Sequence, residues 1–273
     1  MARCHYDILP KMPLNWIDVK PLSFNTLLLL ERVQLSWLPG WAPEKELAVA
    51  LQANPAVEWF LRHKCPEIAP WVDQVTAQAP PAGSLNPEQV RQAEIQVLGA
   101  LEDLVVYAVD PAIYDTQPFL VWDDRELTSL FDFSGKIVLD VGAGTGRLAF
   151  IAAPLARAVF AVEPVGNLRN YMKAKAKSLG YSNVYPVDGL ITDLPFPEGF
   201  ADVVLAGHVF GDNPPVEYAE LQRVTRPGGM VILCPGASIS EEPAHVYLLE
   251  QNFRWDWLPE PGGRPTRKYW NTL

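Results

Sequence analysis

The interpretation of the whole chain depends on one stretch, Lys136-Ile-Val-Leu-Asp-Val-Gly-Ala-Gly-Thr-Gly-Arg147. Its first five residues form a short, mostly apolar run that ends in an acid, which is typical of a buried strand. A glycine loop, residues 142–146, follows almost at once, and residues 147–156 have the composition of a helix. Glycines at alternate positions permit unusual backbone angles and let a ligand approach main-chain N–H groups closely. We therefore predict a ligand-binding loop between a strand and a helix.

Strands and helices alternate from this loop to the end of the chain. Further strands are predicted at residues 158–162, 184–187, 201–206 and 230–234, and helices at residues 119–130, from 163 to 179 with a glycine C-cap, 214–224 and 244–252. The tail, residues 254–258 and 266–270, predicts a hairpin around a Pro-Gly-Gly turn. This alternation predicts an α/β fold with a doubly wound parallel sheet, to which the hairpin adds an antiparallel edge. Ligands bind such sheets beyond the carboxyl ends of the strands.

Residues 1–118 have a different pattern, in which prolines interrupt short helical segments. Helices are predicted at residues 22–37, 44–52, 55–63 and 66–78. After a linker at residues 79–84, Asn86 is a suitable N-cap, and Gln89 completes a capping box for a helix that continues to Asp110. We expect two domains, a helical N-terminal region of residues 1–118 and the α/β region of residues 119–273.

The composition limits the classes of partner and the cellular location that we expect. The net charge of −10 arises from 32 acids against 22 bases and disfavours nucleic acid, because an acidic surface repels phosphates. Lys173, Lys175 and Lys177 are interpreted as a solvated helix face. Three cysteines are too few for a disulfide framework, no signal peptide is evident, and no apolar run approaches the roughly 20 residues of a membrane span. We expect a cytoplasmic protein.

No metal site is predicted. Cys4-His5 and the His63/Cys65 pair lack the spacing that is usual for zinc ligands. Cys234 lies within an apolar strand and is interpreted as a packing residue.

The residues around the glycine loop distinguish between adenosine cofactors. Arg147 occupies the position that a dinucleotide-binding fingerprint fills with glycine or alanine, so its bulk is expected to crowd a pyrophosphate. Asp140 would also repel a pyrophosphate, whereas it suits a cationic ammonium, either through its charge or by fixing the loop. Glu163, at the end of the second strand, can accept both ribose hydroxyls of any adenosine cofactor. Together these residues favour S-adenosylmethionine over NAD or FAD.

Five segments in order carry a resemblance to a known family: residues 138–146, 161–164, 193–197, 200–204 and 221–229. They resemble the successive motifs of the class I S-adenosylmethionine-dependent methyltransferases, and are most similar to the small-molecule group that includes ubiquinone and menaquinone biosynthesis enzymes. The resemblance implies a Rossmann-like methyltransferase fold of seven strands with a reversed last strand. It also implies methyl transfer to a small-molecule acceptor, which we expect to proceed by in-line displacement. We further expect the helical N-terminal region to cover the cofactor cleft and to build the acceptor pocket.

The resemblance also implies a set of cofactor-binding residues: Asp140, Gly142, Ala143, Gly144, Gly146, Glu163, Pro164, Asp188, Gly189, Leu190 and Gly207. The chain departs from the family at the acid that contacts the adenine amino group. An ungapped match places Leu190 there, and Asp188 lies two residues earlier. We expect Asp188 to contact the adenine, with apolar packing by Leu190 as the alternative.

His208 is the candidate catalytic residue, because it follows the fourth strand, where the methyl group should face its acceptor. It could deprotonate the acceptor, orient it, or contact the cofactor through its backbone. Asp212 is a weaker candidate on the same loop. Asn213-Pro214-Pro215 resembles a motif of amino-methylating enzymes, but begins too late and is interpreted as the start of a helix.

Two alternatives to a small-molecule methyltransferase stay open. One is a non-catalytic module that binds S-adenosylmethionine or S-adenosylhomocysteine, which fold alone does not exclude. The other is a nicotinamide-dependent reductase, which Asp140 and Arg147 disfavour.

Overall fold

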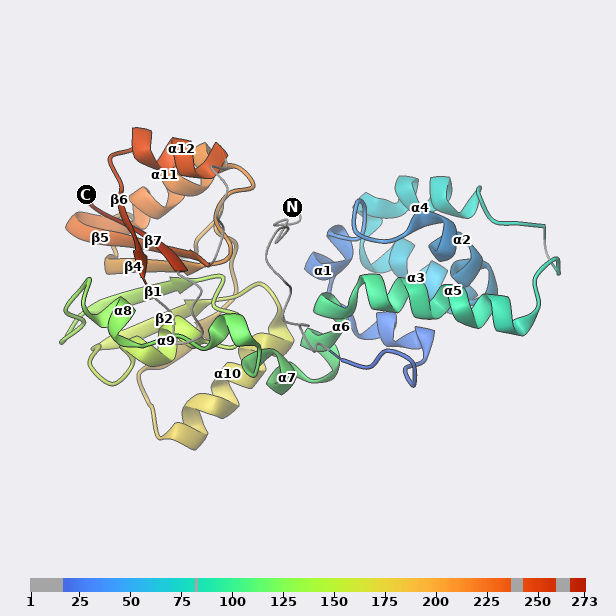
Figure 1. The fold of residues 1–273 in the computed structure, drawn as a ribbon, viewed down its shortest axis with the longest axis horizontal. Helices are drawn as coiled ribbons and strands as arrows, with labels where there is room; N and C mark the ends of the chain where they lie inside the picture. The colour runs from blue at the N-terminus through green and yellow to red at the C-terminus, as the bar shows by residue number, and fades with distance from the viewer. Residues whose placement is uncertain (1–16, 82, 237–242, 259–265) are drawn as a thin grey trace. The chain divides into compact units, whose positions relative to one another are not determined.

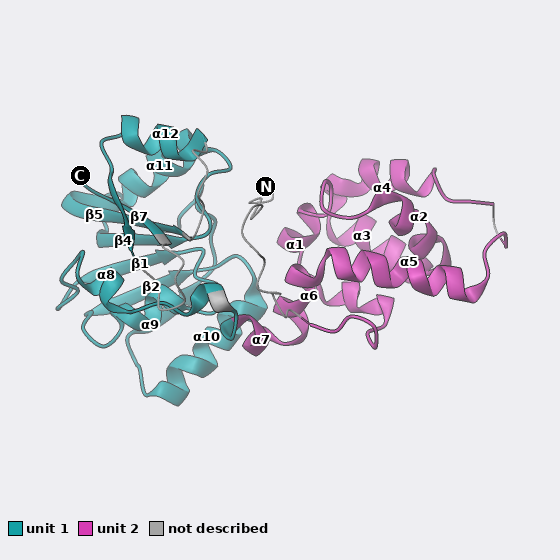
Figure 2. Cartoon of the chain, viewed as in Figure 1, with its two compact units in different colours: residues 1–13, 115–273 teal, residues 14–114 magenta. Residues whose placement is uncertain are grey.

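The computed structural model describes residues 17–81, 83–236, 243–258 and 266–273. The described chain forms two compact units, which divide between Tyr114 and Asp115 (Figure 2). The division predicted from the sequence lies four residues later, after residue 118. We call the two compact units the helical unit, which ends at Tyr114, and the sheet unit, which begins at Asp115.

The helical unit consists of short helices around an apolar core (Figure 1). They are η1 (Phe24–Leu29), α1 (Arg32–Ser36), α2 (Glu44–Ala53), α3 (Pro55–Lys64), η2 (Pro66–Ile68), α4 (Ala69–Thr76), α5 (Pro87–Ala100), α6 (Glu102–Val109) and α7 (Pro111–Asp115), the last of which reaches the division. Leucines and valines fill the core, among them Leu47, Leu61 and Val97. The expected capping box of α5 is confirmed, with Asn86 and Gln89 bonded to each other's backbone.

Two long helices predicted for this region are wrong. The segment predicted as a helix over residues 22–37 breaks at Leu30, whose backbone is extended. The Glu31 N–H donates to Gln34 Oε1 at 3.1 Å and begins α1 separately. The helix that begins after Asn86 breaks at Leu101, which is fully buried. The residue at each break is a buried leucine, so tertiary packing overrides helical periodicity at both positions.

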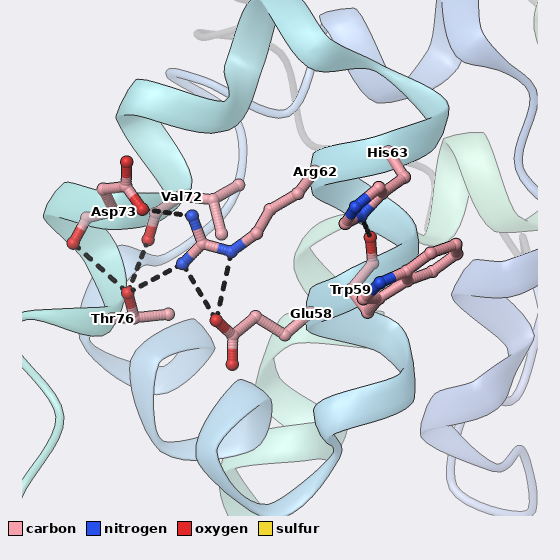
Figure 3. A network of polar contacts seen from close by, with 7 residues as sticks. All are labelled: Glu58, Trp59, Arg62, His63, Val72, Asp73 and Thr76. Carbon is pink, nitrogen blue, oxygen red and sulfur yellow. Dashed lines mark hydrogen bonds and ion pairs between the residues drawn. The ribbon is translucent and has the colours of Figure 1, made fainter.

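A polar network at the surface joins α3 to α4 (Figure 3). The Arg62 guanidinium donates to Glu58 Oε1 on its own helix, to Asp73 and to Thr76 Oγ1. Thr76 Oγ1 in turn donates to the Val72 carbonyl at 2.9 Å. Beside this network, the Trp59 and His63 rings stack 3.8 Å apart.

The sheet unit contains a seven-stranded sheet of order β3-β2-β1-β4-β5-β7-β6. The strands are β1 (Ile137–Val141), β2 (Ala158–Val162), β3 (Val184–Val187), β4 (Ala201–Gly207), β5 (Thr225–Gly236), β6 (Arg254–Leu258) and β7 (Thr266–Thr272). β1 to β5 pair in parallel, and β7 lies antiparallel between β5 and β6. The predicted doubly wound sheet with a reversed last strand is confirmed.

Helices cover both faces of this sheet (Figure 1). They are η3 (Pro118–Leu120), α8 (Arg125–Thr128), α9 (Arg147–Ala152), α10 (Gly166–Leu179), α11 (Pro214–Val224) and α12 (Pro243–Glu250). One core lies beneath α8, α9 and α10, and the other beneath α11 and α12. No described helix combines the length and apolarity needed to cross a membrane.

The single helix predicted over residues 119–130 is wrong. The structure has the short η3 and α8, separated by residues without helical structure. Asp123 Oδ1 accepts the Arg125 N–H at 2.9 Å. This side chain therefore replaces a helical carbonyl as acceptor, and a new helix, α8, begins at Arg125.

Candidate active site

The glycine loop leaves β1 and enters α9 in a conformation that suits glycine alone. Gly142, Gly144 and Gly146 have φ values of +67°, +56° and +89°. A Cβ at Gly142 would lie 2.7 Å from the Val209 side chain, and one at Gly146 would lie 2.6 Å from the Phe150 ring. The loop is therefore packed from two sides by side chains that leave room only for backbone.

Glu163 connects this loop to the end of β2. Its side chain is buried, with Oε2 accepting the Gly144 N–H and Oε1 accepting the Val165 N–H, both at 2.9 Å. A carboxylate oxygen has two lone pairs and can accept more than one hydrogen bond. The acid thus fixes the loop and lies where the sequence placed a ribose-binding carboxylate.

Asp140 lies beneath the loop and is fully buried. Its Oδ2 accepts the Ala149 N–H of α9 at 2.8 Å, so the carboxyl fixes the helix that follows the loop. Burial raises the pKa of Asp140 to about 7, and the charge of Glu163 adds to the rise. Within the described residues, Asp140 Oδ1 and Thr145 Oγ1 are buried polar atoms without a hydrogen-bond partner. Buried polar atoms of this kind call for a ligand or water.

Arg147 has a different role from the one expected. Its guanidinium donates to the Trp122 carbonyl at 2.5 Å, pairs with Asp124 at 2.6 Å, and lies 4.7 Å from the centroid of the Trp122 ring. The side chain therefore attaches residues 122–124 to α9, and the structure gives no support to the argument that its bulk crowds a pyrophosphate.

The residues expected to meet adenine lie after β3. Asp188 is exposed and pairs with the Arg169 guanidinium at 2.9 Å, and the same Arg169 nitrogen donates to the Glu163 carbonyl at 2.7 Å. Leu190 is 43% exposed, and a Cβ at Gly189 would lie 2.8 Å from Val162. Arg169 thus links the Asp188 carboxylate to the end of β2, a connection that the sequence analysis missed.

Lys175 is another residue that the sequence analysis misjudged. The ammonium is not merely solvated: it contacts Asp115 Oδ2 at 2.5 Å, lies 3.4 Å from the Thr145 carbonyl, and lies over the Phe150 ring. Tyr171 donates to the same Asp115 oxygen at 3.0 Å. Because Asp115 is far away in the sequence, the local pattern of lysines could not reveal this contact with the glycine loop.

His208 follows β4 in the left-handed conformation, with φ +57°, which is uncommon for a residue other than glycine and often marks functional sites. Its N–H donates to the Cys234 carbonyl at 3.2 Å, and its ring meets the Phe119 ring edge to face at 5.3 Å. Burial lowers the pKa of His208 to about 4, and the Lys268 charge contributes. The imidazole is therefore neutral near pH 7.

The loop that carries His208 is held by a buried acid. Glu217 accepts the Gly211 N–H at 2.7 Å and the Asn213 N–H at 2.8 Å. Pro214 begins α11 directly after Asn213, which confirms that this segment starts a helix. Asp212 is exposed.

The cysteines and histidines considered as metal ligands do not come together in the described part of the chain. The described part of the chain contains no group of three or more potential metal ligands, and Cys4 and His5 lie outside it. Cys234 is buried, and burial raises the pKa of its thiol to about 12, consistent with a packing role.

A doubly wound seven-stranded sheet with its last strand reversed, a glycine loop after β1 and a buried acid after β2 define a class of protein. The sheet unit has the architecture of class I S-adenosylmethionine-dependent methyltransferase domains. Residues 139–233 match the family described as "Methyltransferase domain". The matched residues lie entirely within the sheet unit.

Individual relatives are similar over shorter stretches. A protein-L-isoaspartate O-methyltransferase of Dictyoglomus turgidum is 38% identical over 26% of this chain and 31% of its own length. A demethylmenaquinone methyltransferase of Bacillus licheniformis is 29% identical over 41% of this chain and 49% of its own. A solved S-adenosylmethionine-dependent methyltransferase of Aquifex aeolicus has a TM-score of 0.48 at 18% identity, covering 60% of this chain and 98% of that one. The chain spans between a fifth and about half of the length of the first curated relatives it matches.

The residues present fit the cofactor of this class. Asp140 Oδ1 and Thr145 Oγ1 are buried polar atoms without a hydrogen-bond partner, and Glu163 is a buried acid that bonds to the loop. Gly142 and Gly146 leave no space for a side chain at the loop. S-adenosylmethionine supplies hydroxyl, ammonium and carboxylate groups, and its sulfonium makes the methyl group electrophilic.

Proposed function

We propose that this protein transfers a methyl group from S-adenosylmethionine to a small-molecule acceptor. The observation that carries the proposal is the buried Glu163, which bonds to the glycine loop at Gly144 and thereby joins the ends of β1 and β2 into one cradle. The methyltransferase family match over residues 139–233 supports the same function. The acidic net charge supports a small molecule over nucleic acid, and the scarcity of cysteine supports a cytoplasmic protein.

Cofactor binding is assigned along the carboxyl ends of β1 to β4. Glu163 would accept the ribose hydroxyls, and Asp140 would face the ammonium with its unused oxygen. Asp188 would meet the adenine amino group from its pair with Arg169, with Leu190 beside the ring. The backbone of the loop and of the following turns would complete the site, at Gly142, Ala143, Gly144, Gly146, Pro164, Gly189 and Gly207.

The methyl-transfer step depends more on alignment of the acceptor with the methyl group than on strong acid–base groups. Methyl transfer requires the acceptor atom in line with the methyl–sulfur bond and the exclusion of water. His208 is assigned the acceptor side, since its neutral imidazole can accept a hydrogen bond from the nucleophile and receive its proton. With a pKa of about 4 it is a weak base, so orientation of the acceptor is the larger part of its role. The helical unit is assigned to acceptor selection.

The test is calorimetry followed by an activity screen. The purified full chain is titrated with S-adenosylmethionine, S-adenosylhomocysteine and NAD, and a metabolite panel rich in hydroxylated aromatic compounds is then screened by mass spectrometry for a one-methyl gain. We expect S-adenosylhomocysteine to bind and at least one acceptor to be methylated. Binding without any turnover would favour the non-catalytic module, and binding of NAD alone would overturn the proposal in favour of a reductase.

A variant separates binding from transfer. His208→Asn keeps a polar side chain that tolerates the left-handed backbone but cannot accept a proton at neutral pH. We expect S-adenosylhomocysteine affinity to stay within about threefold, while methyl transfer falls by about 10²-fold. Unchanged transfer in this variant would remove His208 from the catalytic role.

A further inference from the structure

Trp122 contacts two cations that are far apart in the sequence. The Arg147 guanidinium at the start of α9 lies 4.7 Å from the ring centroid, and the Lys268 ammonium of β7 lies 4.3 Å from it. Trp122 itself is 9% exposed. A cation over an indole is attracted by the ring quadrupole, and more strongly where water is excluded.

Each cation is also paired with an acid from the same short segment. Arg147 pairs with Asp124 and donates to the Trp122 carbonyl, and Lys268 pairs with Glu126, both members of this second pair being buried. The indole and the two acids alternate along residues 122–126, so one short segment supplies the counter-charges for both cations. We call this arrangement the Trp122 clamp.

A gain in folding stability does not by itself account for the buried ion pair of the Trp122 clamp. Desolvating a lysine and a glutamate costs several kcal/mol per ion, and buried ion pairs often contribute no more stability than apolar residues of similar volume. What such pairs do provide, in the best-documented cases, is a single defined arrangement. The arrangement here fixes residues 122–126 against the helix that follows the glycine loop and against the reversed strand.

Phe119, which precedes the Trp122 clamp in the sequence, contacts His208, the residue that we assign to the acceptor side. Phe119 lies three residues before Trp122, and its ring meets the ring of His208 edge to face. His208 in turn holds its left-handed backbone beside the end of β5, with its N–H on the Cys234 carbonyl. The position of the His208 ring therefore depends on a segment whose own anchor is Trp122.

We propose that Trp122 is a positioning residue, which fixes residues 119–126 as one wall of the acceptor site and so holds the His208 ring in its desolvated pose against Phe119. This rests on the proposed function for its catalytic meaning. Trp122 acts through Phe119 and His208 and does not itself touch the reacting atoms.

The test compares Trp122→Leu, Trp122→Phe and the control Trp59→Leu, which removes an indole that is 62% exposed in the helical unit. His208 is followed by ¹H–¹⁵N NMR titration in the full chain, with its signals assigned by their loss in His208→Asn. In Trp122→Leu we expect the pKa of His208 to rise from about 4 toward 6.5, because the ring becomes hydrated. Trp122→Phe should restore most of the wild-type value, and Trp59→Leu should leave it unchanged.

Calorimetry with S-adenosylhomocysteine distinguishes this proposal from the proposed function. The clamp proposal expects wild type and Trp122→Leu to bind with dissociation constants within about threefold of each other. An unchanged His208 titration in Trp122→Leu, with only a lower unfolding midpoint, would overturn the positioning role. No binding by the wild type would overturn the proposed function and leave the titration result as a measure of the clamp.

Where Trp122→Leu fails to fold, Arg147→Leu combined with Asp124→Asn gives the same test. This pair of changes removes one cation together with its counter-ion and leaves the indole and the Lys268–Glu126 pair in place. We expect a smaller rise of the His208 pKa, and its absence in a folded variant would overturn the proposal.

Discussion

The two units of this chain bury different kinds of side chain. Among the described residues, Gln34 is the one buried polar side chain of the helical unit, and its Nε2 donates to the Leu104 carbonyl at 3.0 Å. The sheet unit buries many, including acids, two cations and a histidine: Gln117, Glu126, Asp140, Thr145, Glu163, Asp202, Glu217, Thr225, His245, Arg267 and Lys268. One unit is thus an apolar core with its ion pairs outside, and the other places charge within its core.

This difference indicates where the chemistry lies. Burying a polar group without a partner costs free energy, so buried charge is retained where hydrogen bonds or a ligand compensate for it. In the sheet unit two of the buried acids bond to the backbone of loops, Glu163 at Gly144 and Glu217 at Gly211. These two acids therefore shape the carboxyl edge of the sheet, where we propose that the cofactor binds, whereas stability of the helical unit depends on apolar packing.

The largest effect is expected in the helical core. Leu61→Ala removes a fully buried side chain of α3 and should lower the free energy of unfolding by about 3 kcal/mol, through lost burial and the cavity left behind. Denaturant unfolding followed by circular dichroism measures it. Leu29→Ala, at a side chain that is 59% exposed, is the matched control and should change little.

The same variant tests whether the units differ in function. At a temperature where Leu61→Ala is folded, S-adenosylhomocysteine affinity should equal that of the wild type. A folded variant that binds the ligand tenfold more weakly would contradict the assignment of cofactor binding to the sheet unit alone.

The next effect concerns Glu163. Glu163→Gln keeps the size of the side chain but leaves one acceptor oxygen for the two N–H groups of Gly144 and Val165. In the proposed site the same change also removes a charged acceptor from the ribose hydroxyls. Loss of one ligand hydrogen bond to a buried charge corresponds to about 2 kcal/mol, or about a 30-fold weaker affinity for S-adenosylhomocysteine. Calorimetry measures this, and the exposed Glu198→Gln is the control. Equal affinities in the two variants would show that Glu163 has no part in the cofactor site.

Asp140 should give the sheet unit a pH dependence that the apolar helical core lacks. Its folded pKa of about 7 exceeds the ordinary 3.8, because burial disfavours the charged form. The folded protein therefore binds this proton more tightly, so the stabilisation is complete below pH 3.8 and is lost as the pH rises through 7. Between pH 5 and 8 the free energy of unfolding should fall by on the order of 2 kcal/mol from this group.

Asp140→Asn should flatten this slope, and Asp256→Asn, at an exposed carboxylate, should leave it unchanged. Urea unfolding at several pH values measures both. A slope that persists in Asp140→Asn would assign the dependence to another group.

Sequence patterns predicted the parts of the sheet unit that depend on local order. Strands such as Ala158–Val162 and Val184–Val187, and the helix Pro214–Val224, were predicted at their observed bounds, because each combines an apolar run with clear end signals. Glu163 could be placed beside the glycine loop because parallel strands end at the same edge.

The contacts that were missed join residues far apart in the sequence. Trp122 meets Lys268, and Asp115 meets Lys175, and neither partner carries a local pattern that points to the other. The composition of residues 119–130 predicts a helix, yet the Asp123 side chain and the Trp122 clamp select a different backbone. The sequence therefore predicted that Glu163 lies beside the glycine loop, and missed the contacts that residues 115–126 make with distant parts of the sheet unit.

The smallest effect is expected in the surface network of the helical unit (Figure 3). Asp73 is 68% exposed, and Arg62 keeps its bonds to Glu58 and Thr76 when the Asp73 charge is removed. Exposed ion pairs are screened by water and salt, so Asp73→Asn should cost less than about 0.5 kcal/mol by urea unfolding. Combining it with Glu58→Gln in a double-mutant cycle isolates the network's coupling. A coupling above about 1.5 kcal/mol would mean that polar contacts also stabilise the helical unit, and the contrast between the two units would then be one of position, with charge at the surface of one and in the core of the other.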